Sequence, residues 1–157
     1  MPRMVLLINK PMQEGDPRLS PPPRLKRAGE FRRARRMGKR YRLGFLELFV
    51  HRIRAGGRVG FVIPERVIKK ATKRNRVRRL LREAVRLWWN HVVPGCDMVL
   101  CVRSLPRHDH GWYVEGVFLQ LLLRSELLQS SGEDEARRRV ESLPPEFREG
   151  GGKARER

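Results

Sequence analysis

The side chains best suited to chemistry in this chain are the arginines and lysines of residues 72–86, which surround an apolar stripe. The stripe recurs at i, i+3, i+4, i+7, i+8 and i+11, the spacing of one buried face of an α-helix. Its members are Val77, Leu80, Leu81, Ala84, Val85 and Trp88. The other faces are mostly arginine, with Asn75 among them. Guanidinium groups bind phosphate oxygens in pairs and stack on bases, so the helix predicts a nucleic-acid partner.

A catalytic set of carboxylates, by contrast, is not visible in the sequence. Hydrolysis by two metal ions needs carboxylates close together, whereas the seven acidic side chains of residues 24–116 are spread out. They are Glu30, Glu47, Glu65, Glu83, Asp97, Asp109 and Glu115. The sequence also has no glycine-rich phosphate loop of a familiar type. It therefore argues against a self-sufficient nuclease, although carboxylates distant in sequence can converge in a fold.

Three neighbouring residues, His108, Asp109 and His110, form the one cluster that suggests a metal or phosphate contact. They stand where a helix is expected to begin, and aspartate is a favoured cap for the first turn of a helix. We therefore interpret Asp109 as a helix cap, with the metal or phosphate contact as the alternative.

The charge of the chain is strongly positive and unevenly placed. The net charge is +19 and the pI is about 11.5. Residues 24–42 hold ten basic side chains against Glu30 alone, and residues 66–86 hold ten against Glu83 alone. Residues 130–157 hold seven acids and seven bases and add nothing to the net charge. The positive field therefore belongs to the folded region, which favours an ordered surface for a polyanion over a merely basic tail.

The cysteines and the apolar runs bear on where the protein resides. Cys96 and Cys101 stand five positions apart in an expected strand, so they point to opposite faces and predict two buried free thiols. No apolar run reaches the roughly 18 residues that span a bilayer. The run from Met4 to Ile8 is shorter than the about 7–15 apolar residues of a signal peptide. We expect a cytoplasmic protein with no membrane partner.

The chain divides into three predicted parts. Residues 1–23 form a proline-rich N-terminal extension, residues 24–129 an RNA-binding α+β domain, and residues 130–157 a mixed-charge tail that we expect to be disordered. The domain opens with a helix over residues 25–38, whose expected inward side chains are Leu25, Ala28, Phe31, Ala34 and Met37.

The remaining elements follow from the pattern of apolar residues. Residues 41–54 and 58–63 predict two strands, which Gly56-Gly57 would join in a hairpin. The basic helix is expected over residues 72–90, and the apolar run at residues 97–103 predicts a central strand covered on both faces. A last helix over residues 109–128 would bury Val114, Val117, Phe118, Leu121 and Leu122. This order of helix, strand, strand, helix, strand and helix predicts an α+β fold, with helices packed on a small mixed β-sheet.

Residues 73–83, which contain the triplet Arg74-Asn75-Arg76, resemble the Arg-Asn-Arg signature of the bacterial ribonuclease P protein subunit. The flanking motifs occur in the family's order. Residues 24–31 resemble its opening helix, residues 58–62 the strand before the signature, and residues 95–103 the strand after it. The triplet alone is a weak motif, but the triplet on a basic helix with these flanks is a specific one.

The resemblance spans about residues 24–126 and implies the ribosomal-protein-like fold of that family together with its mechanism. The family's RNA subunit carries out the Mg²⁺-dependent removal of the 5′ leader from precursor tRNA. The implied partners are therefore ribonuclease P RNA and precursor tRNA, with no protein partner. Mg²⁺ would be held mainly by the RNA and by no motif of this chain, which would supply no catalytic residue.

The resemblance also assigns roles to individual residues. Those implied to contact the RNA subunit are Arg74, Asn75, Arg76, Arg78 and Arg79. Those implied to line a cleft for the single-stranded leader are Phe31, Arg35, Phe49, Arg78, Arg82 and Arg86. A basic groove with aromatic rings binds single strands with little sequence preference, as a leader site requires. Phe31 and Phe49 also lie on apolar faces, so a role in the core is the alternative for both.

Two positions depart from the family pattern. Arg35 stands where many members carry an aromatic residue, and Pro64-Glu65-Arg66 replaces a frequent Ser-Lys-Lys. The alternative function is that of a structural RNA-binding protein such as a ribosomal protein, because such proteins share a small basic α+β fold.

Overall fold

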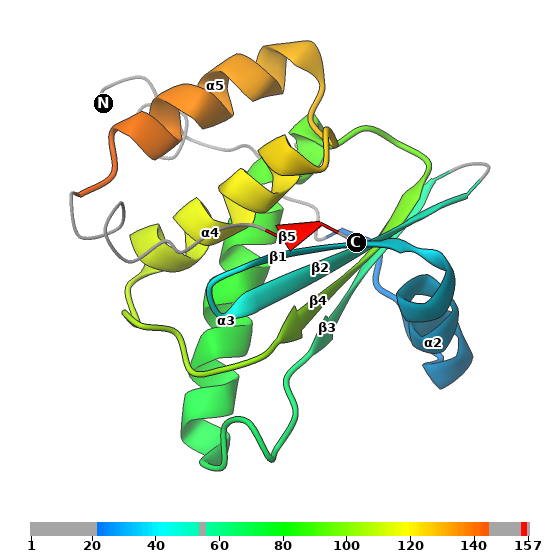
Figure 1. Cartoon of the computed structure of the whole chain (residues 1–157), viewed down its shortest axis with the longest axis vertical. Helices are drawn as coiled ribbons and strands as arrows, with labels where there is room; N and C mark the ends of the chain where they lie inside the picture. The colour runs from blue at the N-terminus through cyan, green and yellow to red at the C-terminus, as the bar shows by residue number, and fades with distance from the viewer. Residues whose placement is uncertain (1–21, 54–55, 145–154, 157) are drawn as a thin grey trace, which may run out of the picture.

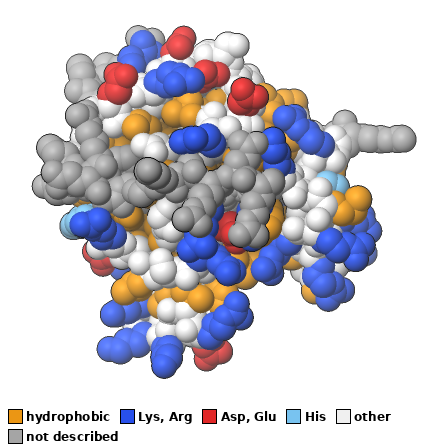
Figure 2. Space-filling model, in the orientation of Figure 1, with side chains coloured by type: hydrophobic (Ala, Val, Ile, Leu, Met, Phe, Trp, Pro, Cys, Tyr) orange, Lys and Arg blue, Asp and Glu red, His pale blue; other side chains and the backbone are white. Residues whose placement is uncertain are grey.

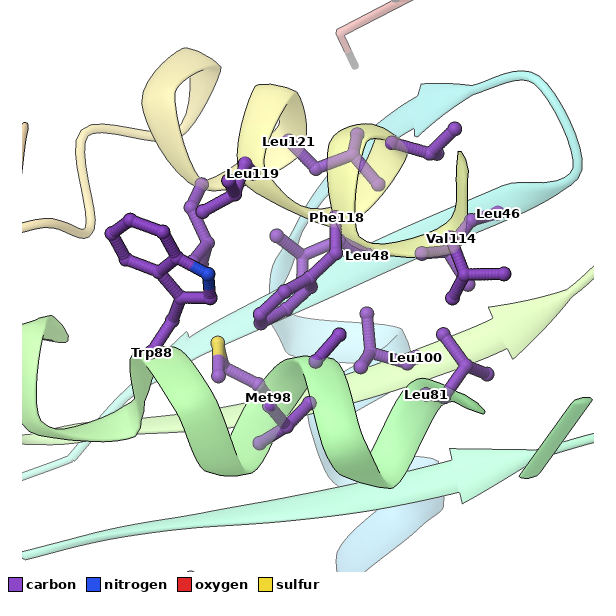
Figure 3. Packing of buried hydrophobic residues seen from close by; sticks show 14 of the residues in the cluster. Leu46, Leu48, Leu81, Trp88, Met98, Leu100, Val114, Phe118, Leu119 and Leu121 are labelled. Atoms are coloured by element: carbon purple, nitrogen blue, oxygen red, sulfur yellow. The ribbon is translucent and has the colours of Figure 1, made fainter. Parts of the chain in front are cut away.

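Helix α3 (Ala71–Trp88) forms where the apolar stripe predicts it. In the computed structural model, which describes residues 22–53, 56–144 and 155–156, this stripe packs beside helix α4 (Gly111–Arg124) on one face of a β-sheet (Figure 1). The predicted stripe of α4 is confirmed, since its five members are fully buried. Figure 3 shows Leu81 and Trp88 of α3 and Phe118 of α4 meeting Met98 and Leu100 of the sheet.

The sheet has the strand order β3-β4-β2-β1-β5. Its members are β1 (Lys39–Leu43), β2 (Leu46–Arg52), β3 (Gly57–Val62), β4 (Cys96–Val102) and β5 (Arg155–Glu156). Strand β4 is central and buried at every residue, which confirms the prediction from its apolar run. It pairs antiparallel with β2 and parallel with β3, so the predicted α+β fold with a mixed sheet is confirmed.

Two strand predictions were wrong. The segment predicted as one strand over residues 41–54 forms both β1 and β2, which turn back on each other at Gly44, a residue with a φ of 58°. The hairpin predicted through Gly56-Gly57 does not form either, because β2 and β3 flank β4 on opposite sides. Helix α3 is long enough to serve as the crossover between parallel strands, so β3 pairs with the more distant β4.

Helix α2 (Ala28–Met37) covers the opposite face of the sheet over a second, smaller core. This core contains Leu25, Ala34, Phe49, Val99 and Cys101, with Phe31 and Val62 partly buried beside it. Two of the predicted inward residues, Ala28 and Met37, are instead exposed, because the helix begins only at Ala28 and a single stripe faces the sheet. Cys96 lies in the first core and Cys101 in the second, and both are free thiols, as predicted.

The prediction of disorder from residue 130 was wrong for the residues that can be described. Helix α5 (Ser130–Glu141) lies over α4 and beside the short 3-10 helix η2 (Trp89–His91) (Figure 1). It buries Gly132 and Ala136, and Leu143 is buried just beyond its end. Residues 145–154 of the predicted tail and residues 1–21 of the predicted extension lie outside the described residues. None of the helices described here is long and apolar enough to cross a membrane.

A buried carboxylate joins the three helices α3, α4 and α5. Glu115 of α4 is 5% exposed and accepts a hydrogen bond from the indole Nε1 of Trp88 at 2.8 Å. Its other oxygen accepts from Nε and Nη2 of Arg139 at 3.2 and 2.9 Å. A buried charge needs such partners, so Arg139 anchors α5 although the surface of that helix is polar.

We predict that Arg139→Ala lowers the free energy of unfolding by about 3 kcal/mol, because among the described residues the buried Glu115 carboxylate then keeps only the Trp88 indole as a donor. Urea denaturation followed by circular dichroism measures the loss. Arg138→Ala removes an exposed neighbour on the same helix and should change stability by less than about 0.5 kcal/mol. Equal effects of the two substitutions would contradict the anchoring role of Arg139.

Candidate nucleic-acid interface

Helix α3 presents arginines around its buried stripe, and the first of the signature arginines, Arg74, is engaged within the chain. Its Nη1 donates to the carbonyl oxygens of Ile68 at 2.9 Å and Lys69 at 2.8 Å. These carbonyls belong to the turn that precedes α3, and the N-terminus of α3 has no side-chain cap. Arg74 therefore holds the turn against the helix, a role that the sequence did not predict.

The second signature arginine, Arg76, bridges α3 to the segment before α4. Its Nε donates to Asp109 Oδ2 and its Nη2 to the Asp109 carbonyl, both at 2.9 Å. The prediction that Asp109 caps α4 was therefore wrong, since the N-cap is His110 and no side-chain cap bond forms there. The Arg76 guanidinium donates to the carboxylate and to the backbone carbonyl of Asp109 at the same time, whereas a helix cap would engage the carboxylate alone. The described residues contain no group of three or more His, Cys, Asp or Glu side chains that could hold a metal ion.

The remaining signature residues, Asn75, Arg78 and Arg79, make fewer hydrogen bonds with described residues than Arg74 and Arg76 do. Asn75 accepts a hydrogen bond from Arg78 Nη1 at 2.8 Å, and both side chains stay at the surface. Arg79 is exposed and makes no hydrogen bond or ion pair with any described residue. Further along α3, Arg86 is paired with Glu83 at 2.6 Å. Arg79 is thus the signature arginine whose guanidinium is freest to meet a phosphate.

Like charges also gather where α3 meets the edge of the sheet. Arg24 bridges to Val59 in the edge strand β3, and it lies close enough to α3 to act on Arg82. Partial burial lowers the pKa of Arg82, and the neighbouring charges of Arg24 and Arg78 lower it further. Cations this close repel one another, and an anion bound among them would reduce that repulsion.

An open hollow of about 640 Å³ lies between α2 and the sheet, on the face opposite α3. Its lining is mostly basic and consists of Gly29, Arg32, Arg33, Arg35, Arg36, Met37, Arg40 and Phe49. The guanidinium of Arg35 stands over the Phe49 ring, 5.7 Å from its centre, which is a cation–π arrangement. Phe49 is 6% exposed, so it belongs to the core and contributes little surface to the hollow.

The residues implied for a leader cleft are therefore divided between two surfaces. Arg35 and Phe49 meet in the hollow, whereas Phe31 packs over Gly60 of β3, where an added Cβ would overlap the Phe31 ring. Arg78, Arg82 and Arg86 lie on α3, beyond the other face of the sheet. The other lining arginines of the hollow were missed as site residues. The feature of the sequence that could have identified them is the high density of basic residues over residues 24–42.

An arginine on β3 fixes α2, and with it the hollow, to the sheet. Arg58 donates to the buried Asp97 from Nε at 3.3 Å and from Nη2 at 2.8 Å, and its Nη1 bonds Glu30 of α2. Hydrogen bonds from the backbone N–H groups of Arg27 and Lys26 lower the pKa of Glu30, and Arg58 lowers it further. One ionised network thus ties the start of α2 to β3 and to the central strand β4.

The surface charge follows these elements. Figure 2 shows lysine and arginine side chains over α2 and over the end of α3 that lies away from α5. The acidic side chains visible on this face gather mainly over α5. The two basic surfaces, α3 and the α2 hollow, are thus carried by different helices on different faces of the sheet.

Comparison with known proteins matches residues 19–110 to the family described as Ribonuclease P. The ribonuclease P protein component of Roseiflexus sp. (strain RS-1) is 37% identical over 110 residues, covering 69% of this chain and 89% of that protein. That of Natranaerobius thermophilus is 35% identical over 108 residues, covering 68% and 93%.

Solved structures agree with this match. The RNase P protein from Thermotoga maritima is similar with a TM-score of 0.57 and 26% identity, over 64% of this chain and 96% of that chain. The Staphylococcus aureus RNase P protein is similar with a TM-score of 0.60 over 68% of this chain and 97% of that chain. At 17% identity the second likeness shows the fold alone.

We predict that Arg58→Ala lowers the free energy of unfolding by about 2 kcal/mol, because it strips the side-chain donors from the buried Asp97 while Arg58 itself is partly solvated. Arg58→Lys should recover only part of this loss, since an ammonium cannot make the forked contact. Thermal and urea unfolding measure both changes, with the exposed Arg42→Ala as control. Full stability of Arg58→Lys would show that the fork is not required.

Proposed function

The chain belongs to the ribonuclease P protein component family, and we propose that it binds the catalytic RNA of ribonuclease P and the 5′ leader of precursor tRNA. In this proposal it assists the Mg²⁺-dependent endonucleolytic removal of the leader. The observation that carries the proposal is the presence of two separate basic surfaces, α3 and the α2 hollow, on opposite faces of one sheet. Two surfaces allow two RNAs to be held at once.

We assign the RNA subunit to α3. Structured RNA offers closely spaced phosphates, and each phosphate contact by an arginine releases counterions. Asn75, Arg78 and Arg79 are exposed or half-exposed and would make these contacts directly. Arg74 and Arg76, which are bonded to backbone carbonyls and to Asp109, would act mainly by fixing the shape of the surface.

We assign the single-stranded leader to the α2 hollow. Its arginines would follow the phosphates, while the Arg35 guanidinium, which stands over the Phe49 ring, would meet the bases. Stacking on flat groups is worth about 1–3 kcal/mol per base and tolerates any sequence, which suits an enzyme that meets many leaders. The cations at the β3 edge, Arg78 and Arg82, would then guide the RNA between the two surfaces.

We propose that the chemistry is carried out by the RNA with Mg²⁺ that the RNA holds. The described residues offer Mg²⁺ no cluster of three ligands, and hard divalent cations are well served by phosphate oxygens. The part of this chain would be to bind, to orient and to reduce the repulsion between the two RNAs, which lowers the Mg²⁺ concentration that they require.

The decisive experiment is cleavage of a precursor tRNA at low Mg²⁺ with the protein alone, with a bacterial ribonuclease P RNA alone, and with both. We expect a mature 5′ end only in the mixture. Cleavage by the protein alone would mean that an active site exists in this chain. Binding to RNA without any gain in cleavage would instead favour a structural RNA-binding protein.

Two single substitutions should separate the two surfaces. Arg79→Ala should weaken binding of ribonuclease P RNA about tenfold and leave a leader oligonucleotide unaffected, because it removes one charged contact from α3 alone. Arg35→Ala should weaken binding of the leader oligonucleotide and leave the affinity for ribonuclease P RNA unchanged. Both side chains are exposed and neither belongs to the core, so folding should be unchanged.

Fluorescence anisotropy with each labelled RNA measures these affinities. Arg138→Ala on α5 serves as the control, since it removes one exposed arginine far from both surfaces in the sequence. A loss of affinity for the same RNA in both variants would refute the division into two surfaces.

A further inference from the structure

Three aromatic rings cluster at the start of α4. The ring centres of His108, His110 and Trp112 lie 5.5–6.4 Å apart, and their planes are within 33° of one another. His110 is exposed, while His108 and Trp112 are half-buried. We refer to these three rings as the ring platform. No role in the function proposed above accounts for it.

The ring platform is held firmly from below. The buried Tyr113 meets His108 and Trp112 edge-on, at 5.2 and 6.1 Å between ring centres. Tyr113 is itself stacked on Phe45, which follows Gly44 in the turn between β1 and β2, with 6.1 Å between ring centres. Rings supported by the core in this way are already ordered before a ligand arrives, so little conformational freedom is lost on binding.

The ring platform also adjoins the signature helix. Asp109, which stands between His108 and His110, is bonded twice to Arg76 of α3. Gly111 lies against the same helix, since a Cβ placed on it would be 3.9 Å from Leu80 Cδ2. Arg79 follows Arg76 by three positions and is therefore its neighbour on the helix surface. The exposed Arg107 leads into the platform and acts on Tyr113 by its charge.

The charge around the rings favours an anionic partner. Arg79 and Arg107 are exposed and make no hydrogen bond or ion pair with a described residue. The adjoining acid, Asp109, is already bonded to Arg76. Flat rings with free cations at their border match an unpaired nucleotide, whose base has a π-face and whose phosphate is negative. The platform lies with α3 and α4 on the face of the sheet opposite the leader hollow. Because the RNA subunit is assigned to α3, that RNA, rather than the leader, is the expected partner of the platform.

We propose that the ring platform stacks an unpaired base of ribonuclease P RNA through His110 and Trp112, with Arg79 and Arg107 on the flanking phosphates. This inference rests on the proposed function and extends the RNA interface from α3 onto α4. Arg76 and Asp109 would then be positioning residues, because the hydrogen bonds between them hold the platform against the signature helix.

The test is a titration of ribonuclease P RNA, at several salt concentrations, with the full chain and its variants. His110→Ala should weaken binding about tenfold, the low to middle part of the range for one stacked base. The dependence of affinity on salt should not change, because stacking releases no counterions. His110→Tyr, which keeps a ring, should bind within about twofold of the unaltered chain. Arg79→Ala should instead reduce the salt slope by about one.

Two further variants guard the interpretation. Trp112→Phe should keep most of the affinity and Trp112→Ala should lose it, although the second also removes a side chain that packs against the core. Thermal unfolding identifies any loss of fold, and His110, being exposed, supplies the test if Trp112→Ala is unstable. His51→Ala removes a histidine far from the platform in sequence and should have no effect.

Three outcomes would overturn the inference. Unchanged affinity in His110→Ala beside a clear loss in Arg79→Ala would show that no base stacks on the rings. A lower salt slope in His110→Ala, without rescue by His110→Tyr, would show that the histidine acts as a cation. If the unaltered chain itself failed to bind the RNA, the proposed function would fall, and this result is distinct from the other two.

Discussion

Strand β4 is buried at each of its seven residues, and a strand of that kind needs apolar cover on both faces of its sheet. The need for cover on two sides dictates the arrangement of the helices. Helices α3 and α4 supply the larger core on one face, and α2 supplies the smaller core on the other. Because α2 and α3 are also the most basic helices, burying β4 places positive charge on opposite sides of one thin domain.

Many of the arginines also stabilise the fold. Arg58 and Arg139 each satisfy a buried carboxylate, and Arg74 satisfies backbone carbonyls. Arginine suits these tasks because its guanidinium has five donors in a fixed plane and stays charged when partly buried. Exposed arginines that form no ion pair with a described residue, such as Arg79 and Arg35, remain available at the surface, whereas Arg40 of the α2 hollow is paired with Glu47 at 3.3 Å. The high net charge is therefore the remainder after structural pairing, and it is concentrated where RNA is proposed to bind.

Sequence patterns were reliable where one element determines its own burial. The stripes of α3 and α4 and the apolar run of β4 were predicted because periodicity reports which side chains face inward. The hairpin at Gly56-Gly57 failed because a local turn signal cannot reveal that β4, about 40 residues later, pairs with β3. Helix α5 was missed because its composition is polar, and its anchor, Glu115, lies on another helix. In the site, the arginines of α3 and Arg35 were identified, whereas the other arginines of the α2 hollow were missed. The internal partners of the α3 arginines are set by the tertiary structure and could not be read from sequence.

Helix α2 rests on a small core and on one charged network through Arg58, whereas α3 and α4 share the main core. Regions with few buried contacts open locally at a lower free energy than the global unfolding of the domain. The amides of α2 should therefore exchange with deuterium earlier than those of α3. A ligand seated between α2 and the sheet would bind only the closed form and would protect these amides by mass action. The strength of the Arg58 network thus sets how much of the binding energy in the hollow is spent on closing the helix.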